Sequence, residues 1–219
     1  MHGAFADASS WNGVVEWLQA EGVQVTAPAN PLCGISIDSA YIASLIDQIP
    51  GPVLAGGHSY AGAVITNANN VVGLVYVAAF APDKGERLGE IESNPKDSVL
   101  NTALMPLKYP TGQGQETVTE FVVDPAKFHD AFAADLPAKQ TAVMAAAQRP
   151  VAEVALSEPN GKPDWKKLPS RAVVATGDKA AGADVVRSMA ERAGAKITEV
   201  GASHVVMISH PQDVTSVTS

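Results

Sequence analysis

The sequence predicts an α/β protein built on a mostly parallel sheet with helices on its faces. Segments of strand character alternate with segments whose apolar residues recur at helical spacing, a pattern typical of parallel sheets. Residues 71–79 are almost entirely apolar, as expected of a strand buried on both faces. A chain of 219 residues is long enough for one large core that carries one insertion.

We expect the core to be split along the chain into residues 1–82 and 170–219. In the first part, apolar residues recur every three or four positions in three segments, which predicts helices at 9–18, 36–49 and 60–69. Apolar and β-branched runs predict strands at 23–27, 52–55 and 71–79. The second part repeats the alternation with a strand at 172–175, a helix at 183–193 and a strand at 196–200.

Residues 83–169 differ in composition from the rest of the chain, because prolines, glycines and polar residues recur along them. Within this segment, apolar residues at helical spacing predict helices at 125–136 and 138–148. Because this segment leaves after one sheet strand and returns just before the next, we expect a mainly helical cap inserted over the carboxyl edge of the sheet. Large apolar side chains of the cap could line a substrate pocket or form the cap's own core; they are Met105, Phe121, Phe128, Phe132, Met144 and Trp165.

Charge and composition limit the classes of partner that the protein could bind and the cellular location that we expect for it. The chain has 23 acidic and 15 basic residues and no run of Lys or Arg, which argues against nucleic acids and anionic membranes as partners. No window approaches the roughly 18 apolar residues of a membrane helix. The single cysteine, Cys33, excludes an intrachain disulfide. We therefore expect a cytoplasmic monomer or homodimer that acts on a small molecule.

One serine stands where a strand is predicted to turn into a helix. Gly57-His58-Ser59-Tyr60-Ala61 fits the nucleophile pattern G-x-S-x-G except at its last position, where alanine stands and Gly62 follows. Small residues around the serine let strand and helix approach closely and expose its hydroxyl. A dinucleotide-binding turn would instead need G-x-G-x-x-G and an acid about 20 residues later. Ser59 is therefore the candidate nucleophile.

A serine needs a base, and the base needs an acid to orient it. His204 comes just after the last predicted strand, where a loop at the carboxyl edge of the sheet could reach Ser59. Asp178 follows the preceding strand and gives the chain order Ser, Asp, His. Asp83, after the strand at 71–79, is the alternative acid.

Acyl transfer also needs two N–H donors for the developing oxyanion. Tyr60, directly after Ser59, lies at a predicted helix start and can supply one. The second donor is expected from the loop at residues 2–5, with Ala4 preferred and Phe5 as the alternative. We place Phe5, Phe128 and Trp165 among the residues that contact the substrate.

The chain resembles the cap-bearing α/β-hydrolases, which include small bacterial esterases, plant methyl-salicylate-type esterases and hydroxynitrile lyases. The resemblance lies in HGAFADASSW, GGHSYAGAVI, VYVAAFAPDKGE, VVATGDKA and GASHVVMISHPQ, which together span most of the chain. It implies hydrolysis of small carboxylic esters through Ser59, His204 and Asp178, with an acyl-enzyme and no metal or organic cofactor.

Two other functions stay open at this point. Lyase members resemble the chain in fold and triad but carry threonine in place of Gly3 and lysine in place of Val205, so those two positions favour ester hydrolysis. A C–C lyase that uses the same triad as a base remains the first alternative. A truncated, non-catalytic ligand-binding homologue is the second.

The resemblance also implies a departure at the start of the sequence. Family members begin with an apolar strand that runs into the His-Gly motif, whereas Met1 stands directly before His2. We therefore expect the family's first strand to be missing and its neighbours to lack ladder partners. One hypothesis is a start codon assigned too late, since a GTG valine codon read as an initiator is written as methionine.

Overall fold

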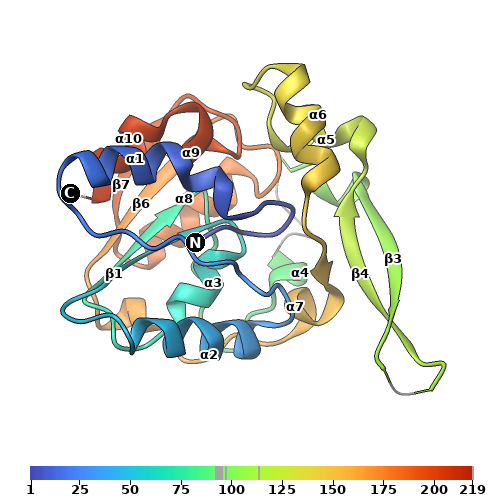
Figure 1. The fold of residues 1–219 in the computed structure, drawn as a ribbon, viewed down its shortest axis with the longest axis horizontal. Helices are drawn as coiled ribbons and strands as arrows, with labels where there is room; N and C mark the ends of the chain where they lie inside the picture. Colours follow the sequence, from blue (N-terminus) through green and yellow to red (C-terminus); the bar gives the residue numbers. More distant parts are fainter. Residues whose placement is uncertain (92–95, 97, 113, 219) are drawn as a thin grey trace.

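A four-stranded parallel sheet forms the centre of the protein (Figure 1). The computed structural model describes residues 1–91, 96, 98–112 and 114–218. The sheet has the order β1-β2-β6-β7, and every neighbouring pair is parallel. The strands are β1 (Leu54–His58), β2 (Gly73–Val77), β6 (Ser170–Ala175) and β7 (Lys196–Val200). The predicted parallel α/β fold is confirmed.

Helices cover both flanks of this sheet, as the helical spacing of apolar residues predicts. Figure 1 shows α1 and α10 side by side on one flank, with α2 and α3 on the other. The helices of the core are η1 (Ala8–Trp11), α1 (Asn12–Ala20), α2 (Ile35–Ile46), α3 (Ala61–Thr66), α8 (Ala183–Arg192), α9 (Val206–Ser209) and α10 (Pro211–Thr218). Every residue of β2 is buried, as its unbroken apolar sequence predicts.

The long segment between β2 and β6 contains both helices and strands. Its elements are α4 (Leu88–Ile91), η2 (Leu100–Thr102), β3 (Leu104–Pro110), β4 (Thr117–Val123), α5 (Pro125–Phe132), α6 (Ala138–Ala147), β5 (Val151–Ala152), α7 (Glu153–Ser157) and η3 (Asp164–Lys166). Because β2 and β6 pair directly, this segment is an excursion between adjacent strands. The two helices predicted near 125–136 and 138–148 are confirmed as α5 and α6.

The excursion also contains an antiparallel sheet, β3-β4-β5, which the sequence analysis did not predict. The β3–β4 hairpin projects away from the body of the molecule (Figure 1). Its β-branched run Thr117-Val118-Thr119 is a strand signal. Its partner, β3, contains Pro106 and Pro110, and prolines normally argue against a strand. Proline is tolerated here because β3 is an edge strand of its sheet.

The strand predicted at residues 23–27 is also wrong, because this stretch has no regular secondary structure. A strand exists only when its backbone pairs with another. Within the described residues, no strand pairs with the outer edge of β1, so the sheet ends there. None of the described helices is long and apolar enough to cross a membrane.

Candidate active site

Ser59 lies on the tight turn between β1 and α3. Its φ of +54° is a left-handed conformation that is strained for a residue with a side chain. Three backbone hydrogen bonds hold the turn: Ser59 N–H donates to Val77 O at 3.3 Å, while Phe80 N–H and Gly62 N–H donate to Ser59 O at 3.3 and 2.9 Å. A serine with a left-handed φ between a strand and a helix is the geometry that the G-x-S-x-G pattern predicts.

Close packing explains why alanine is tolerated at the last position of the serine motif. A Cβ added to Gly57 would lie 2.6 Å from Ala61 O, and one added to Gly62 would lie 2.2 Å from Phe80 O. Ala61 itself is completely buried without such a conflict. In this chain the second close approach therefore falls on Gly62, which packs against the loop that follows β2.

His204 and Asp178 form a buried pair at the carboxyl ends of β7 and β6. Their Nδ1 and Oδ2 atoms lie 2.8 Å apart, and each side chain is only 1% exposed. The other carboxylate oxygen of Asp178 accepts hydrogen bonds from Ala180 N–H and Ala181 N–H at 2.9 and 3.0 Å. An ionised Asp178 makes Nδ1 of His204 a donor and leaves Nε2 as the basic nitrogen.

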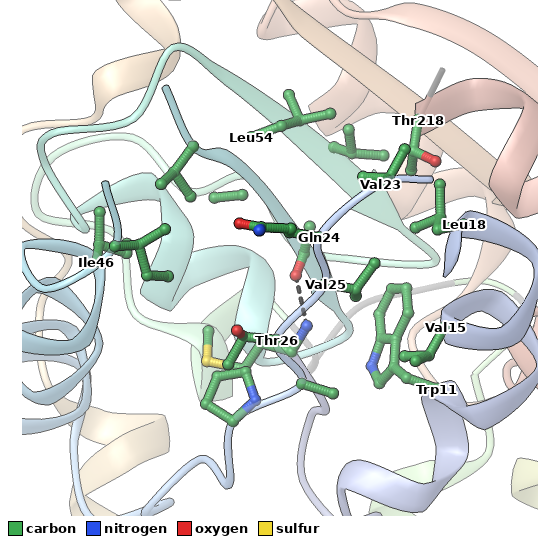
Figure 2. A pocket seen from close by; sticks show the side chains of 18 of the residues that line it. Trp11, Val15, Leu18, Val23, Gln24, Val25, Thr26, Ile46, Leu54 and Thr218 are labelled. Atoms are coloured by element: carbon green, nitrogen blue, oxygen red, sulfur yellow. Dashed lines mark hydrogen bonds between the residues drawn. The ribbon is translucent and has the colours of Figure 1, made fainter. Parts of the chain in front are cut away.

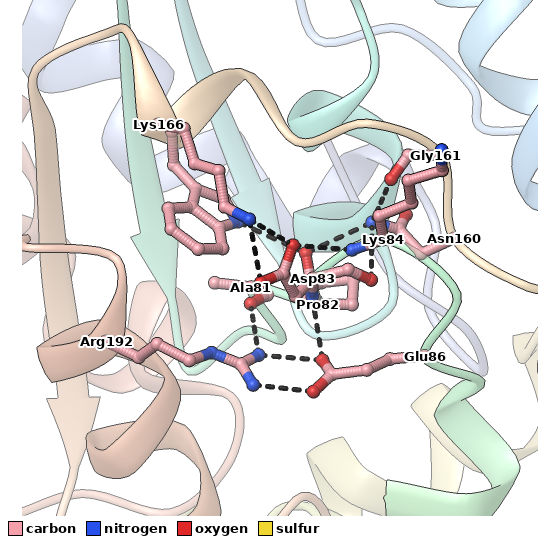
Figure 3. A network of polar contacts seen from close by, with 10 residues as sticks. Ala81, Pro82, Asp83, Lys84, Glu86, Asn160, Gly161, Lys166 and Arg192 are labelled. Atoms are coloured by element: carbon pink, nitrogen blue, oxygen red, sulfur yellow. Dashed lines mark hydrogen bonds and ion pairs between the residues drawn. The ribbon is translucent and has the colours of Figure 1, made fainter.

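Asp83, the alternative acid, belongs to a different network (Figure 3). Both its carboxylate oxygens accept hydrogen bonds from Lys166 Nζ, at 2.6 and 2.8 Å. This hydrogen bond from Lys166 holds the pKa of Asp83 below its usual value. Arg192 and Glu86 form a second ion pair in the same network. These contacts join the two ends of the excursion to each other and to α8, and none of them involves His204.

Trp165, predicted to contact the substrate, lies beside this same network. Its indole N–H donates to Pro82 O at 3.1 Å, and Lys166 Nζ lies 5.1 Å from the ring centroid. Arg192 also approaches the indole ring, at 6.0 Å. The structure therefore places Trp165 in a different environment from the aromatic residues around His204.

Two rings, those of His58 and Phe132, contact the candidate base, and two more pack against Phe132. The His58 ring lies 4.5 Å from that of His204, and its Nε2–H donates to His204 O at 2.9 Å. Burial and the neighbouring His204 hold the pKa of His58 well below its usual value, so this ring is neutral at pH 7. The Phe132 ring lies 5.0 Å from His204, 5.0 Å from Phe128 and 6.1 Å from Phe5.

Phe132 and His58 are the residues of this cluster that the sequence did not single out. Phe132 was one of six large apolar residues of the expected cap. The position of Phe132 along the chain gives no sign that its side chain, unlike those of the other five, contacts the His204 ring. Phe128, which was singled out, is fully buried behind it.

The loop at residues 3–5 packs directly on the serine turn. A Cβ added to Gly3 would lie 2.6 Å from His58 O, 2.8 Å from Ser59 Cβ and 3.3 Å from Tyr60 N. Phe5 N–H donates to Arg149 O at 3.1 Å, so this N–H is not available to bind an oxyanion. Of the two oxyanion donors considered for this loop, Ala4 is left as the candidate beside Tyr60.

The excursion also contacts the loop that carries His204. The carboxylate of Asp135 accepts hydrogen bonds from both the backbone N–H of Ser203, at 3.0 Å, and the hydroxyl of Ser203. Ser203 directly precedes His204, so Asp135 ties the excursion to the candidate base.

The family of the chain follows from a match to a family model. The model described as "Alpha/beta hydrolase family" matches residues 1–217. The chain belongs to the α/β hydrolase family. No curated protein matches this hydrolase.

Solved structures share the fold of this hydrolase at low sequence identity. Polyneuridine aldehyde esterase is 20% identical, with a TM-score of 0.82, and the match covers 98% of this chain and 94% of that one. An extracellular α/β-hydrolase from a Paenibacillus species is 18% identical over 100% of this chain and 95% of that one, with a TM-score of 0.78. A methylesterase from Arabidopsis is 16% identical over 99% and 94%, also with a TM-score of 0.78.

Neither of two cavities in the hydrolase is lined by Ser59, Asp178 or His204. The larger, of about 610 Å³, lies beside β1. Ser59 is 8% exposed, so the candidate nucleophile is largely covered. In the described part of the chain, no group of three or more His, Cys, Asp or Glu side chains is placed to hold a metal ion.

Proposed function

We propose that the protein hydrolyses small carboxylic esters, with Ser59 as nucleophile, His204 as general base and Asp178 as the acid that orients it. The observation that carries the proposal is the buried His204–Asp178 pair, held beside the strained turn of Ser59 through His58. A buried His–Asp pair beside a serine on a strained turn is typical of acyl-transfer sites.

The proposed reaction is acyl transfer in two steps. His204 Nε2 takes the proton of Ser59 as its oxygen attacks the ester carbonyl, and the N–H groups of Ala4 and Tyr60 stabilise the oxyanion. Collapse of this intermediate expels the alcohol, which receives the proton from His204. Water then attacks the acyl-enzyme by the same route, releasing the acid and regenerating Ser59. The step requires no metal or organic cofactor.

The aromatic cluster supports an apolar substrate group. Phe5 and Phe132 meet at 6.1 Å, and Phe132 reaches the His204 ring. We infer that Phe5 and Phe132 contact the substrate, with Phe128 behind them, and that residues 83–169 form the cap over the site. The similar structures named above include an aldehyde esterase and a methylesterase, which fits the same class of reaction.

The lyase alternative is less well supported because Gly3 has no room for the threonine expected of lyases. A Cβ at this position would lie 2.6 Å from His58 O, closer than real Cβ contacts allow. The cyanohydrin-cleaving arrangement would therefore require the loop or the serine turn to move.

The Ser59→Ala variant tests the proposal. We expect the purified chain to hydrolyse p-nitrophenyl acetate and butyrate, and Ser59→Ala to lower kcat by at least about 10³-fold because the nucleophile is lost. The matched control is Ser39→Ala, which removes a buried hydroxyl that donates to Val64 O in the core. The control should keep its activity, with circular dichroism confirming that all three chains fold.

Two outcomes would contradict the esterase proposal. One is a folded Ser59→Ala chain that turns over as fast as the unsubstituted chain. The other is a folded, unsubstituted chain that is inert on both esters, and release of cyanide from a cyanohydrin would then point to the lyase.

A further inference from the structure

A fully buried carboxylate that the proposed reaction does not use lies in α2. Asp38 is 0% exposed, whereas Ser59, His204 and Asp178 account for the nucleophile, base and acid of the proposed site. A buried carboxylate is costly unless hydrogen bonds satisfy it, so its partners indicate what it does. The helix that carries it, α2, packs against α3, which begins at the serine turn (Figure 1).

Asp38 lines neither of two cavities that residues of α2 help to form. The larger lies beside β1, with Trp11, Ile46 and Leu54 around it (Figure 2), and the smaller lies between α2 and residues 158–161. The carboxylate of Asp38 therefore binds groups within the protein and not a ligand in either cavity.

One oxygen of the carboxylate binds the residue that follows the candidate nucleophile. The hydroxyl of Tyr60 donates to Asp38 Oδ2 at 2.7 Å, and Tyr60 is 2% exposed. Burial and the nearby Asp38 raise the pKa of Tyr60 far above its ordinary value, so the hydroxyl keeps its proton and donates. The side chain of Tyr60 is therefore fixed in the core, while its backbone N–H is one of the two proposed oxyanion donors.

The other oxygen binds a strained loop that precedes α2. Cys33 N–H donates to Asp38 Oδ1 at 3.1 Å, and the neighbouring N–H groups of Gly34 and Leu32 also favour the ionised carboxylate. Leu32 has a φ of +62°, a left-handed conformation that is strained for a residue with a side chain. Such a conformation persists only where surrounding contacts fix it, and Asp38 supplies one of these contacts.

The same loop also holds the residues that carry the second proposed donor. Asn30 N–H donates to His2 Nε2 at 2.8 Å, and Asn30 Nδ2 donates to His2 O at 3.2 Å. His2 Nδ1–H then donates to Gly3 O at 2.9 Å, directly before Ala4. His2 and Asn30 are both completely buried. Asp38 is therefore connected to the loop that carries Ala4 through a short stretch of chain.

The environment of Asp38 fits an ionised carboxylate. Burial raises the pKa of this carboxyl group, while the hydrogen bonds from Tyr60 and Cys33 act in the opposite direction. Its two oxygens accept from an O–H and an N–H donor. Hydrogen bonds to an ionised acceptor are among the strongest in proteins, so these two can hold a tyrosine and a backbone loop in place.

We propose that Asp38 is a positioning residue that fixes both oxyanion donors, Tyr60 directly and Ala4 through the loop at residues 30–34. In the proposed function, on which this inference rests, the N–H groups of Tyr60 and Ala4 stabilise the oxyanion. Asp38 does not touch the reacting atoms, so its effect falls on how accurately the donors are held. A displaced donor stabilises the transition state less, while binding of the substrate is hardly changed.

The Tyr60→Phe variant tests the proposal, because it removes only the hydroxyl that bonds Asp38. We expect kcat on p-nitrophenyl butyrate to fall about tenfold, with KM within about twofold of its value for the unsubstituted chain. This is part of the roughly 10²- to 10³-fold loss that follows complete removal of an oxyanion donor. Asp38→Asn should have a similar effect, because an amide cannot accept hydrogen bonds at both of its positions.

The matched control is Tyr76→Phe, the same change at a second buried tyrosine. Tyr76 is 1% exposed, and its hydroxyl lies 2.8 Å from Oγ1 of Thr66, at the other end of α3. Both tyrosine variants should lose stability in thermal unfolding, but only Tyr60→Phe should lose kcat. An equal loss of kcat in both, or full kcat in Tyr60→Phe and Asp38→Asn, would overturn the proposal because the role of Asp38 would then be structural only.

The double variant shows whether the two side chains act together. If Asp38 acts through the hydroxyl of Tyr60, combining Asp38→Asn with Tyr60→Phe should lower kcat by clearly less than the product of the two single effects. A loss equal to that product would overturn the direct link between Asp38 and Tyr60.

Amide hydrogen exchange tests the positions of the donors without relying on activity. Gly62 N–H donates to Ser59 O at 2.9 Å and reports on the serine turn, while Asn30 N–H reports on the contact with His2. We expect exchange at one or both of these N–H groups to be at least tenfold faster in the Asp38→Asn variant than in the Tyr76 control.

A reference N–H separates local loosening from a general loss of stability. Thr176 N–H donates to Val200 O at 2.9 Å, where β6 and β7 end, and should exchange equally in the two variants. Tyr60→Phe provides the same comparison at Gly62 if Asp38→Asn does not fold.

The two measurements also separate this proposal from the proposed function. Unchanged exchange at both Gly62 and Asn30 would overturn the positioning role, whether or not the protein cleaves esters. Faster exchange in a folded chain that cleaves neither p-nitrophenyl ester would support the positioning role and contradict the esterase instead.

Discussion

Replacing Asp178 by asparagine should lower kcat for ester hydrolysis by about 10⁴-fold while the protein stays folded. The amide keeps the shape of the side chain, but it removes the charge that stabilises a protonated His204. It also offers an NH₂ group where Nδ1–H of His204 needs an acceptor at 2.8 Å. The wrong tautomer would then leave Nε2 unable to take the proton of Ser59. Steady-state kinetics on p-nitrophenyl butyrate measure the effect.

The matched control is Asp83→Asn, the same change at the other candidate acid. Asp83 forms an ion pair with Lys166 near the surface. Exposed ion pairs contribute little to stability, so losing this one should leave kcat within about twofold of the value for the unsubstituted chain. A reversed outcome, with Asp83→Asn inactive and Asp178→Asn active, would contradict the assignment of the acid.

The Gly3→Ala variant should lose at least about 10²-fold in kcat/KM, comparable to removing an oxyanion donor. The added Cβ would lie 2.6 Å from His58 O and 2.8 Å from Ser59 Cβ, so the loop must move away from the serine turn. That movement takes the N–H of Ala4 away from the developing oxyanion. Kinetics with the same ester, together with thermal unfolding, separate a displaced donor from a loss of fold.

Gly201→Ala is the control, because a Cβ at Gly201 would meet no heavy atom within 4 Å. It should retain nearly full activity even though it lies close to His204 in sequence. Full activity in Gly3→Ala would show that Ala4 does not serve as an oxyanion donor.

The parallel core could be predicted because its signals are local. Apolar runs such as residues 71–79 are long enough to read as buried strands, and β7 was predicted with the same bounds that the structure has. The His204–Asp178 pair also followed from order along the chain, since loops after neighbouring parallel strands meet at one edge of the sheet.

The remaining features depend on distant parts of the chain. Residues 23–27 have the composition of a strand but no partner to pair with, so composition alone gave the wrong prediction. The role of Phe132 depends on how the excursion packs over His204, which spacing along the chain does not reveal. Trp165 was expected to contact the substrate because it is a large residue of the cap, but its indole N–H donates to Pro82 O, away from His204.

The most direct test of the account is covalent labelling of Ser59 with diisopropyl fluorophosphate, read by intact-protein mass spectrometry and peptide mapping. Phosphorylation of a serine by this reagent requires the activation that an ester-cleaving triad provides. We predict one adduct per chain, located on Ser59, absent in Ser59→Ala and strongly reduced in His204→Ala. A folded chain that stays unlabelled, or an adduct on another residue, would contradict the assignment of Ser59 as an activated nucleophile.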